Sequence, residues 1–155
     1  MKYDGDYNYK GPKGGALIGC PDEVTGHFDC ERYRLTSLVG APSIVGNYFN
    51  CDNNNLTSLE GLSTTVGRVF YCRYNNLTSL HNVHKQVRSC TAFWCGGNKI
   101  ESHILGLLLI PNLTYIGSHM PAIELIAKYV GKGKPGILQA QRDLIDAGLE
   151  EFAEL

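Results

Sequence analysis

The sequence predicts an α/β fold: a short solenoid of repeated coils with a parallel β-sheet, capped by C-terminal helices. The first observation is a segment that recurs at a fixed period, as FDCERYRLTSL, FNCDNNNLTSL and FYCRYNNLTSL at 28–38, 49–59 and 70–80. The second is a degraded fourth copy, FWCGGNKI, which starts at Phe93, slightly later than this period requires, and the third is a pair of helical patterns after residue 120. A fixed period of this length indicates units that bury their apolar faces only against neighbouring units.

Each repeat contains columns with separate physical roles. Phe and Cys stand two residues apart, so their side chains leave a short strand on the same side and enter the core. The Asn that follows can bond backbone groups left open where the strand turns, and the next Leu points back inward. In the second copy these columns hold Phe49, Cys51, Asn54 and Leu56, preceded by Val45. The first copy departs from the pattern, with Tyr33 at the Asn position.

The pattern F-x-C-x-x-N-x-L resembles the core of the leucine-rich repeat, L-x-x-L-x-L-x-x-N-x-L, with Phe and Cys at two Leu positions. More narrowly, the LTSLxG segments and the C-terminal GIL-x-x-Q-x-x-L-x-x-AGLEEFAEL resemble parts of small, uncharacterised proteins of tailed bacteriophages. The resemblance covers most of the chain after about residue 17. It implies a leucine-rich-repeat-like solenoid and a phage origin, and it assigns no activity.

The chain divides into three predicted regions. Residues 1–15, MKYDGDYNYKGPKGG, are polar and lack the repeat, so we expect a flexible N-terminal arm. An alternative is that the tyrosines of this arm, Tyr3, Tyr7 and Tyr9, dock on a partner. Residues 16–100 form the solenoid, which begins near Leu17 with the second half of a repeat. Residues 101–155 form a mainly helical cap over the end of the stack.

Within the cap, the residue pattern predicts each element in turn. Residues 104–110 are an apolar run that indicates a buried helix ended by Pro111. Residues 113–116 alternate like a last short strand beside the fourth repeat. Pro121 stands at a favoured first-turn position, and a last helix starts at Pro135 and ends near Gly148.

The amino-acid composition indicates which binding partners and which cellular compartment to expect for this protein. The 14 basic and 15 acidic residues nearly cancel, so no strong field steers the chain to nucleic acid or to an anionic membrane. No apolar run approaches the ~20 residues that span a bilayer, and the N-terminus lacks the apolar part of a signal peptide. We therefore expect six reduced cysteines in a cytoplasm, which the phage resemblance makes the host cytoplasm.

The outward positions of the repeats form the candidate binding site. Parallel strands lie about 4.8 Å apart, so equivalent residues stack into columns. One column holds Asp29, Asn50, Tyr71 and Trp94, and the next holds His27, Tyr48, Val69 and Ala92. Tyr48, Tyr71 and Trp94 would form an aromatic surface of the kind that anchors interfaces. We take the candidate binding residues to be Tyr48, Tyr71, Trp94, Asn50, Asp29 and His27. The alternative is that these aromatics only favour strands and stack on one another.

No catalytic, metal or cofactor motif emerges from the sequence. The C-x4-C spacing of Cys90 and Cys95 and the H-x2-H spacing of His81 and His84 match no zinc signature. The repeat cysteines are interpreted as small core residues. His27 beside Asp29 is the nearest approach to an acid–base pair, and we interpret it as surface chemistry. The sequence thus predicts a protein that is not an enzyme and that holds no metal and no cofactor.

The functional expectation is a non-catalytic protein-binding module, in which the strand face of a phage protein holds a host protein. Host takeover or counter-defence would be its role. The alternative is a small-molecule sequestering or enzymatic protein with a pocket between the solenoid and the C-terminal helices, and a third reading is a structural virion component. The sequence leaves the oligomeric state and the partner's identity open.

Overall fold

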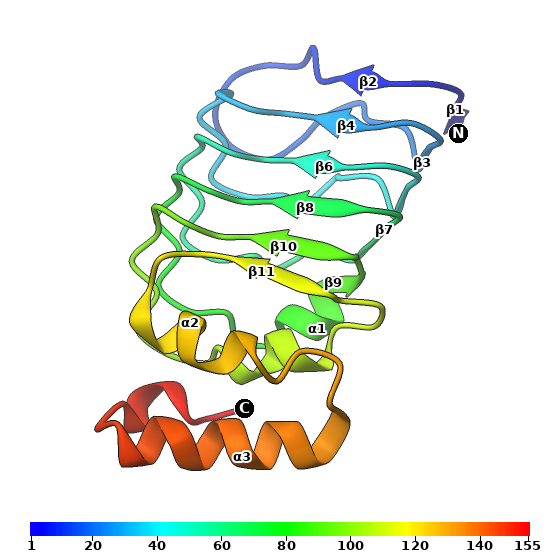
Figure 1. Cartoon of the computed structure of the whole chain (residues 1–155). Helices are drawn as coiled ribbons and strands as arrows, with labels where there is room; N and C mark the ends of the chain where they lie inside the picture. Colours follow the sequence, from blue (N-terminus) through cyan, green and yellow to red (C-terminus); the bar gives the residue numbers. More distant parts are fainter.

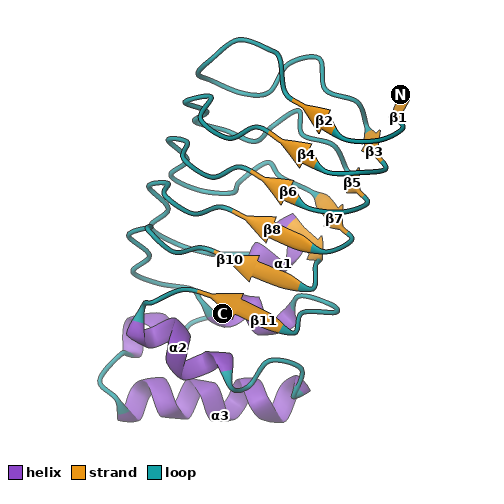
Figure 2. Ribbon diagram, turned by 45° about the horizontal axis from the view of Figure 1, so that its top comes forward, coloured by secondary structure: helices purple, strands orange, loops and turns teal.

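The chain winds into stacked coils from its N-terminus to residue 117, and helices cover the last coil (Figure 1). This computed structural model describes all 155 residues. It confirms the predicted fold class, a solenoid with parallel β-sheets and C-terminal helices. The coils contribute short strands to two separate sheets, which line two sides of the stack (Figure 2).

The six-stranded sheet contains the Phe and Cys strands of the repeats. Its order is β11-β10-β8-β6-β4-β2, and every neighbouring pair is parallel. The strands are β2 (Tyr7–Asn8), β4 (Phe28–Asp29), β6 (Phe49–Asn50), β8 (Val69–Tyr71), β10 (Ala92–Trp94) and β11 (Tyr115–Gly117). The predicted last strand near residues 113–116 is confirmed as β11, which pairs beside β10.

The second sheet has five strands in the order β1-β3-β5-β7-β9. Its strands are β1 (Lys2–Tyr3), β3 (Glu23–Val24), β5 (Ile44–Val45), β7 (Thr64–Val66) and β9 (Val87–Ser89). The recurring valine of this sheet was visible in the sequence, but no strand was predicted there. The β-branched Val24, Val45 and Val66 point inward from it, and a short corner leads to the next strand.

Residues 1–15 are not an arm but most of the first coil of the solenoid. β1 pairs with β3 and β2 with β4, in register with the repeat. Tyr3, Tyr7 and Tyr9 stand one full period before Val24, Phe28 and Cys30. The expectation of a flexible arm was wrong because aromatic residues replace Val, Phe and Cys in these columns. Tyr9 is only 1% exposed and covers the upper end of the core.

The core contains two ladders of equivalent side chains. The rings of Phe28, Phe49, Phe70 and Phe93 are fully buried, and their centroids lie 5.0, 5.2 and 5.2 Å apart along the stack. The cysteine thiols are also buried, as predicted, and they donate hydrogen bonds to backbone carbonyls of the next coil. The pairs are Cys30 to Asn50 (3.3 Å), Cys51 to Tyr71 (3.1 Å) and Cys72 to Trp94 (3.4 Å).

An asparagine ladder, made of Asn54, Asn75 and Asn98, links successive coils. The Asn75 side-chain oxygen accepts the Leu56 N–H of the preceding coil at 3.1 Å. Its nitrogen donates to the carbonyl of Cys51 in that coil (3.1 Å) and to that of Cys72 in its own coil (3.2 Å). Asn54 and Asn98 repeat this pattern. Each of these amides thus joins two coils at fixed register.

The structure explains why Tyr33 can replace asparagine at this position of the first repeat. Its hydroxyl donates to the carbonyl of Tyr9, which occupies the same column as Cys30 and Cys51. The Tyr33 N–H in turn donates to the Asn54 side-chain oxygen at 3.1 Å. A phenol therefore takes over one of the coil-to-coil bonds that an amide makes further along the stack.

The helical cap closes the C-terminal end of the stack (Figure 1). Its elements are the 3₁₀ helix η1 (Leu105–Leu109), α2 (Pro121–Ala127), α3 (Gly133–Asp146) and the 3₁₀ helix η2 (Glu150–Phe152), and a further single-turn helix, α1 (Val83–Gln86), lies within the solenoid before β9. The predicted helix at 104–110 is this short η1. α2 starts at Pro121 as predicted, α3 starts two residues before Pro135, and Gly148 follows its end with φ 74°.

The asparagine ladder predicts a large difference between two adjacent residues. Asn75→Ala leaves the buried carbonyls of Cys51 and Cys72 without their amide donor, so it should lower the free energy of unfolding by about 3 kcal/mol. The matched control Asn76→Ala changes an exposed side chain and should stay within about 0.5 kcal/mol of wild type. Urea denaturation of the three proteins gives the comparison, and equal losses for both variants would refute the role assigned to the ladder.

Candidate functional site

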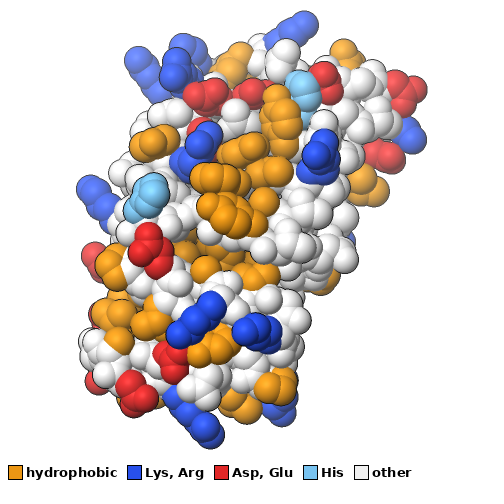
Figure 3. Space-filling view, viewed as in Figure 1, with side chains coloured by type: hydrophobic (Ala, Val, Ile, Leu, Met, Phe, Trp, Pro, Cys, Tyr) orange, Lys and Arg blue, Asp and Glu red, His pale blue; other side chains and the backbone are white.

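The outer face of the six-stranded sheet is the candidate functional site. Side chains alternate along each strand, so the residues between the buried Phe and Cys face outward. The register aligns Asp29, Asn50, Tyr71 and Trp94 in one row of strand partners. All six sequence-predicted site residues lie on this face and are partly exposed. Apolar side chains gather in a band down this side of the molecule, bordered by charged residues (Figure 3).

Five rings form a continuous band along this face, which we call the aromatic band: His27, Tyr48, Tyr71, Trp94 and Tyr115. The His27 and Tyr48 rings stack at 4.3 Å with an interplanar angle of 4°. Tyr48 meets Tyr71 edge to face at 5.9 Å, and Tyr71 lies 6.4 Å from Trp94. Trp94 then contacts Tyr115 at 5.2 Å. The predicted aromatic surface thus exists and is longer than expected.

Tyr115 is a member of the band that the sequence analysis missed. It is the strand partner of Ala92 and is 52% exposed. The available signal was its spacing, because Tyr115 follows Ala92 by the same interval that separates Phe70 of the third repeat from Phe93 of the fourth. Residues around it were predicted to form a strand, but the outward column was not extended to that strand.

Arg73 is the second residue that the sequence analysis missed. Its Nε and Nη2 donate to Asp52 Oδ2 at 2.8 and 2.6 Å, and its backbone N–H donates to Asp52 Oδ1 at 2.6 Å. The guanidinium carbon lies 5.0 Å from the Tyr71 ring centroid and 5.8 Å from that of Trp94. The signal was a pair of opposite charges one period apart, at positions 52 and 73.

The Asp52–Arg73 pair is held in place by burial. The side chain of Asp52 is only 3% exposed. Burial raises the pKa of the Asp52 carboxyl, and the hydrogen bonds from Arg73 oppose that rise. Removal of Arg73 would leave an unpaired buried carboxylate, which is strongly unfavourable. Arg73 is therefore fixed against the aromatic band rather than free to swing away.

His27 and Asp29 do not form an acid–base pair with each other. His27 Nδ1 lies 2.9 Å from Asp6 Oδ1, in the coil above. Asp29 Oδ1 instead accepts the Glu31 N–H at 2.9 Å, and Asp29 Oδ2 accepts a bond from Asn50 at 3.4 Å. Both residues thus have structural partners that connect or close coils.

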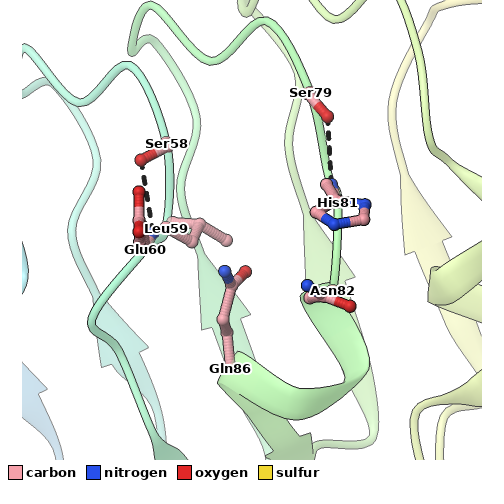
Figure 4. Close-up of a pocket in the computed structure, with 7 residues that line it drawn as sticks. All are labelled: Ser58, Leu59, Glu60, Ser79, His81, Asn82 and Gln86. Atoms are coloured by element: carbon pink, nitrogen blue, oxygen red, sulfur yellow. Dashed lines mark hydrogen bonds between the residues drawn. The ribbon is translucent and has the colours of Figure 1, made fainter.

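A polar hollow of about 220 Å³ lies between two coils (Figure 4), and no residue of the aromatic band lines it. Ser58 and Ser79 line it, and each hydroxyl accepts the backbone N–H of the residue two positions later. Ser79 Oγ is also 3.3 Å from His103 Nδ1, and His103 Nε2 is 3.3 Å from Glu154. Ser37 closes the equivalent turn without any histidine. We therefore assign these serines to turn formation rather than to catalysis.

An apolar hollow of about 570 Å³ lies between η1 and α3. All of its lining residues lie between positions 108 and 155, so it is a hollow within the C-terminal region and not the expected pocket between the solenoid and the C-terminal helices. Leu109, Leu138 and Leu155 line it and are 40%, 47% and 60% exposed. Lys134 is its only charged lining residue. This hollow can accept apolar groups but offers few polar groups to orient them.

The six cysteines form no disulfide bonds, and their thiols are expected to be unreactive. Burial raises the pKa of Cys20 to about 11 and the pKa values of Cys90 and Cys95 to about 12. At neutral pH these groups are protonated, and the thiolate needed for nucleophilic or metal chemistry is scarce. No group of three or more His, Cys, Asp or Glu side chains is arranged to hold a metal ion. No helix combines the length and apolar character needed to cross a bilayer.

The fold and the face define a class of protein: a two-sheeted parallel β-solenoid with a helical cap and an exposed aromatic band. Comparison of the chain with protein-family models, curated proteins and solved structures finds no match. Function is therefore inferred from the geometry of this face.

Thiol chemistry provides a test of the core arrangement. Because their pKa values are raised, the cysteines should react slowly with a disulfide reagent at about pH 8, and the half-buried Cys20 should react first. Six thiols should titrate once the protein is unfolded without reductant. Rapid modification of several cysteines in the native protein, or fewer than six thiols after unfolding, would contradict the structure.

Proposed function

We propose that the chain is a non-catalytic protein-binding module and that the aromatic band is the surface that holds its partner. The observation that carries this proposal is the continuous contact of five partly exposed rings, with Arg73 fixed beside them. Trp, Tyr and Arg are the residue types that most often dominate binding energy at protein interfaces.

The rigidity of the band supports the proposal. Tyr71, Trp94 and Tyr115 lie on paired strands, and Arg73 is bonded to the buried Asp52. The Trp94 ring lies flat over Gly117, where a Cβ atom would be 2.3 Å from the ring. Side chains that are already ordered lose little entropy when a partner binds. A pre-organised face of this kind therefore supports a protein-binding role.

The nature of the partner follows from the resemblance stated above. Repeats similar to those of phage proteins support a host protein as the partner, met in the host cytoplasm. Host takeover or counter-defence is the role that fits such a binder. The near-zero net charge supports a protein partner over nucleic acid or an anionic membrane.

A second candidate function is small-molecule sequestration in the apolar hollow between η1 and α3. Its volume of about 570 Å³ falls within the range of about 300–1,000 Å³ that is typical of ligand sites. Leu138 lies in its wall with nearly half of its surface exposed. Leu138→Glu would place a charge in this hollow without touching the aromatic band, so it separates the two functions.

Tyr115→Ala should weaken partner binding without unfolding the protein. The change removes an exposed ring from the end of the band, so affinity should fall by about 2 kcal/mol while the free energy of unfolding changes by less than about 1 kcal/mol. Ile44→Ala is the matched control, because Ile44 is 44% exposed on the other sheet. Tagged wild type and both variants would be compared by capture from a bacterial lysate, followed by titration of the purified partner.

The outcomes separate the two candidate functions. Capture by wild type and Ile44→Ala but not by Tyr115→Ala supports the aromatic band. Capture that survives Tyr115→Ala unchanged contradicts the assignment of this surface. Loss of a co-purifying small molecule in Leu138→Glu, with no effect of Tyr115→Ala, would favour the second candidate.

A further inference from the structure

We infer that the aromatic band receives an acidic side chain of its partner, an Asp or a Glu, in a cleft beside Trp94 where Arg73 supplies the positive charge. The inference rests on the proposed function of the band and specifies the chemistry of the partner. We call this feature the Trp94 cleft. Its lining residues are Arg73, Tyr74, Trp94, Gly96, Gly97, Gly117, Ser118 and His119.

The size of the Trp94 cleft suits a single side chain. Its volume is about 140 Å³, well below the about 300–1,000 Å³ of ordinary small-molecule sites. A cleft of this size beside an aromatic surface suits an anchor contact, in which one residue of the partner is desolvated. It therefore marks a point contact within a larger protein interface rather than a cofactor site.

Two aromatic rings and three glycines shape the cleft. The Trp94 ring occupies the space over Gly117, and the Tyr74 ring lies over Gly97, where a Cβ atom would be 2.5 Å from the Tyr74 ring. Tyr74 is itself held at φ 55°, a left-handed backbone conformation that Gly97 also adopts one coil later. Gly96 and Gly97 add no side chains, so the space between the two rings remains open.

Arg73 gives the cleft its chemical preference. Asp52 engages Nε and Nη2, and Nη1 makes no hydrogen bond in the structure. A guanidinium carries more N–H donors than this one carboxylate uses, so donors remain for a second acceptor. No acidic side chain lines the cleft itself, and the lining residue His119 has Glu124 Oε1 3.8 Å from its Nδ1. A carboxylate would gain charge-assisted hydrogen bonds here from the Arg73 donors that Asp52 leaves free.

The tryptophan provides a direct readout, because Trp94 is the only one in the chain. The probe is glutarate, which presents a Glu-like carboxylate, and its matched control is the neutral diamide glutaramide, titrated at the same ionic strength. Glutarate should change the Trp94 fluorescence saturably, and glutaramide should leave it unchanged. An equal response to both compounds would overturn the inference, because charge would then play no part.

Two sets of variants place the probe in the cleft. At Gly96 a new Cβ meets no atom within 4 Å, so Gly96→Leu should fold normally while filling the space. It should weaken glutarate binding at least tenfold, whereas the matched Gly96→Ala should change it by less than about threefold. The double variant Asp52→Asn with Arg73→Gln removes both charges without leaving a buried carboxylate, and it should also lose at least tenfold.

The remaining outcomes are decisive in both directions. Unchanged glutarate binding in Gly96→Leu overturns the inference, and so does inorganic phosphate that binds as tightly as glutarate, since the cleft would then be a general anion site. If Tyr115→Ala abolishes partner capture but glutarate never binds, the inference fails and the proposed function stands. If glutarate binds as expected but partner capture is insensitive to Tyr115→Ala, the carboxylate cleft stands and the proposed function fails.

Discussion

The structure depends on one repeated interaction, the bond that each asparagine of the ladder makes to two coils at once. The Asn54, Asn75 and Asn98 amides donate to a carbonyl in their own coil and to its equivalent in the coil before. A slip of one residue between coils would break all of these bonds together. The ladder therefore holds each strand only two or three residues long in register, which such strands could not maintain alone.

Register in the core determines what happens on the surface. The buried Phe rings of successive coils stack in line, so the outward residues next to each Phe along the chain also align. As a result, five rings meet along the outer face of the sheet. The Asp52–Arg73 pair depends on the same alignment, since its members stand one period apart on neighbouring coils. The aromatic band and the Trp94 cleft are thus consequences of the ladder, and a protein with slipped coils would present neither.

The repeat itself could be predicted from the sequence because it uses the same residue types at the same spacing. The parts of the solenoid that were not predicted have the geometry of the repeat, but they contain different residue types or follow a different interval. Tyr7 replaces Phe in the first coil, so that coil was taken for an arm, and Tyr115 follows an interval slightly longer than the regular period. The second sheet was missed because two-residue strands leave no alternating pattern. The position of Arg73 depends on its ion pair with Asp52 in the preceding coil, and the opposite charges one period apart were not recognised as a pair in the sequence.

The exchange of two backbone amides would test the asparagine ladder most directly. The N–H groups of Leu56 and Leu77 lie outside every strand and donate to the side chains of Asn75 and Asn98. Hydrogen exchange measured by NMR should find them protected as strongly as the strand amides of Phe49 and Phe70, because opening them requires separation of two coils. Exchange as fast as that of ordinary exposed loop amides would contradict the ladder and the aligned surface derived from it.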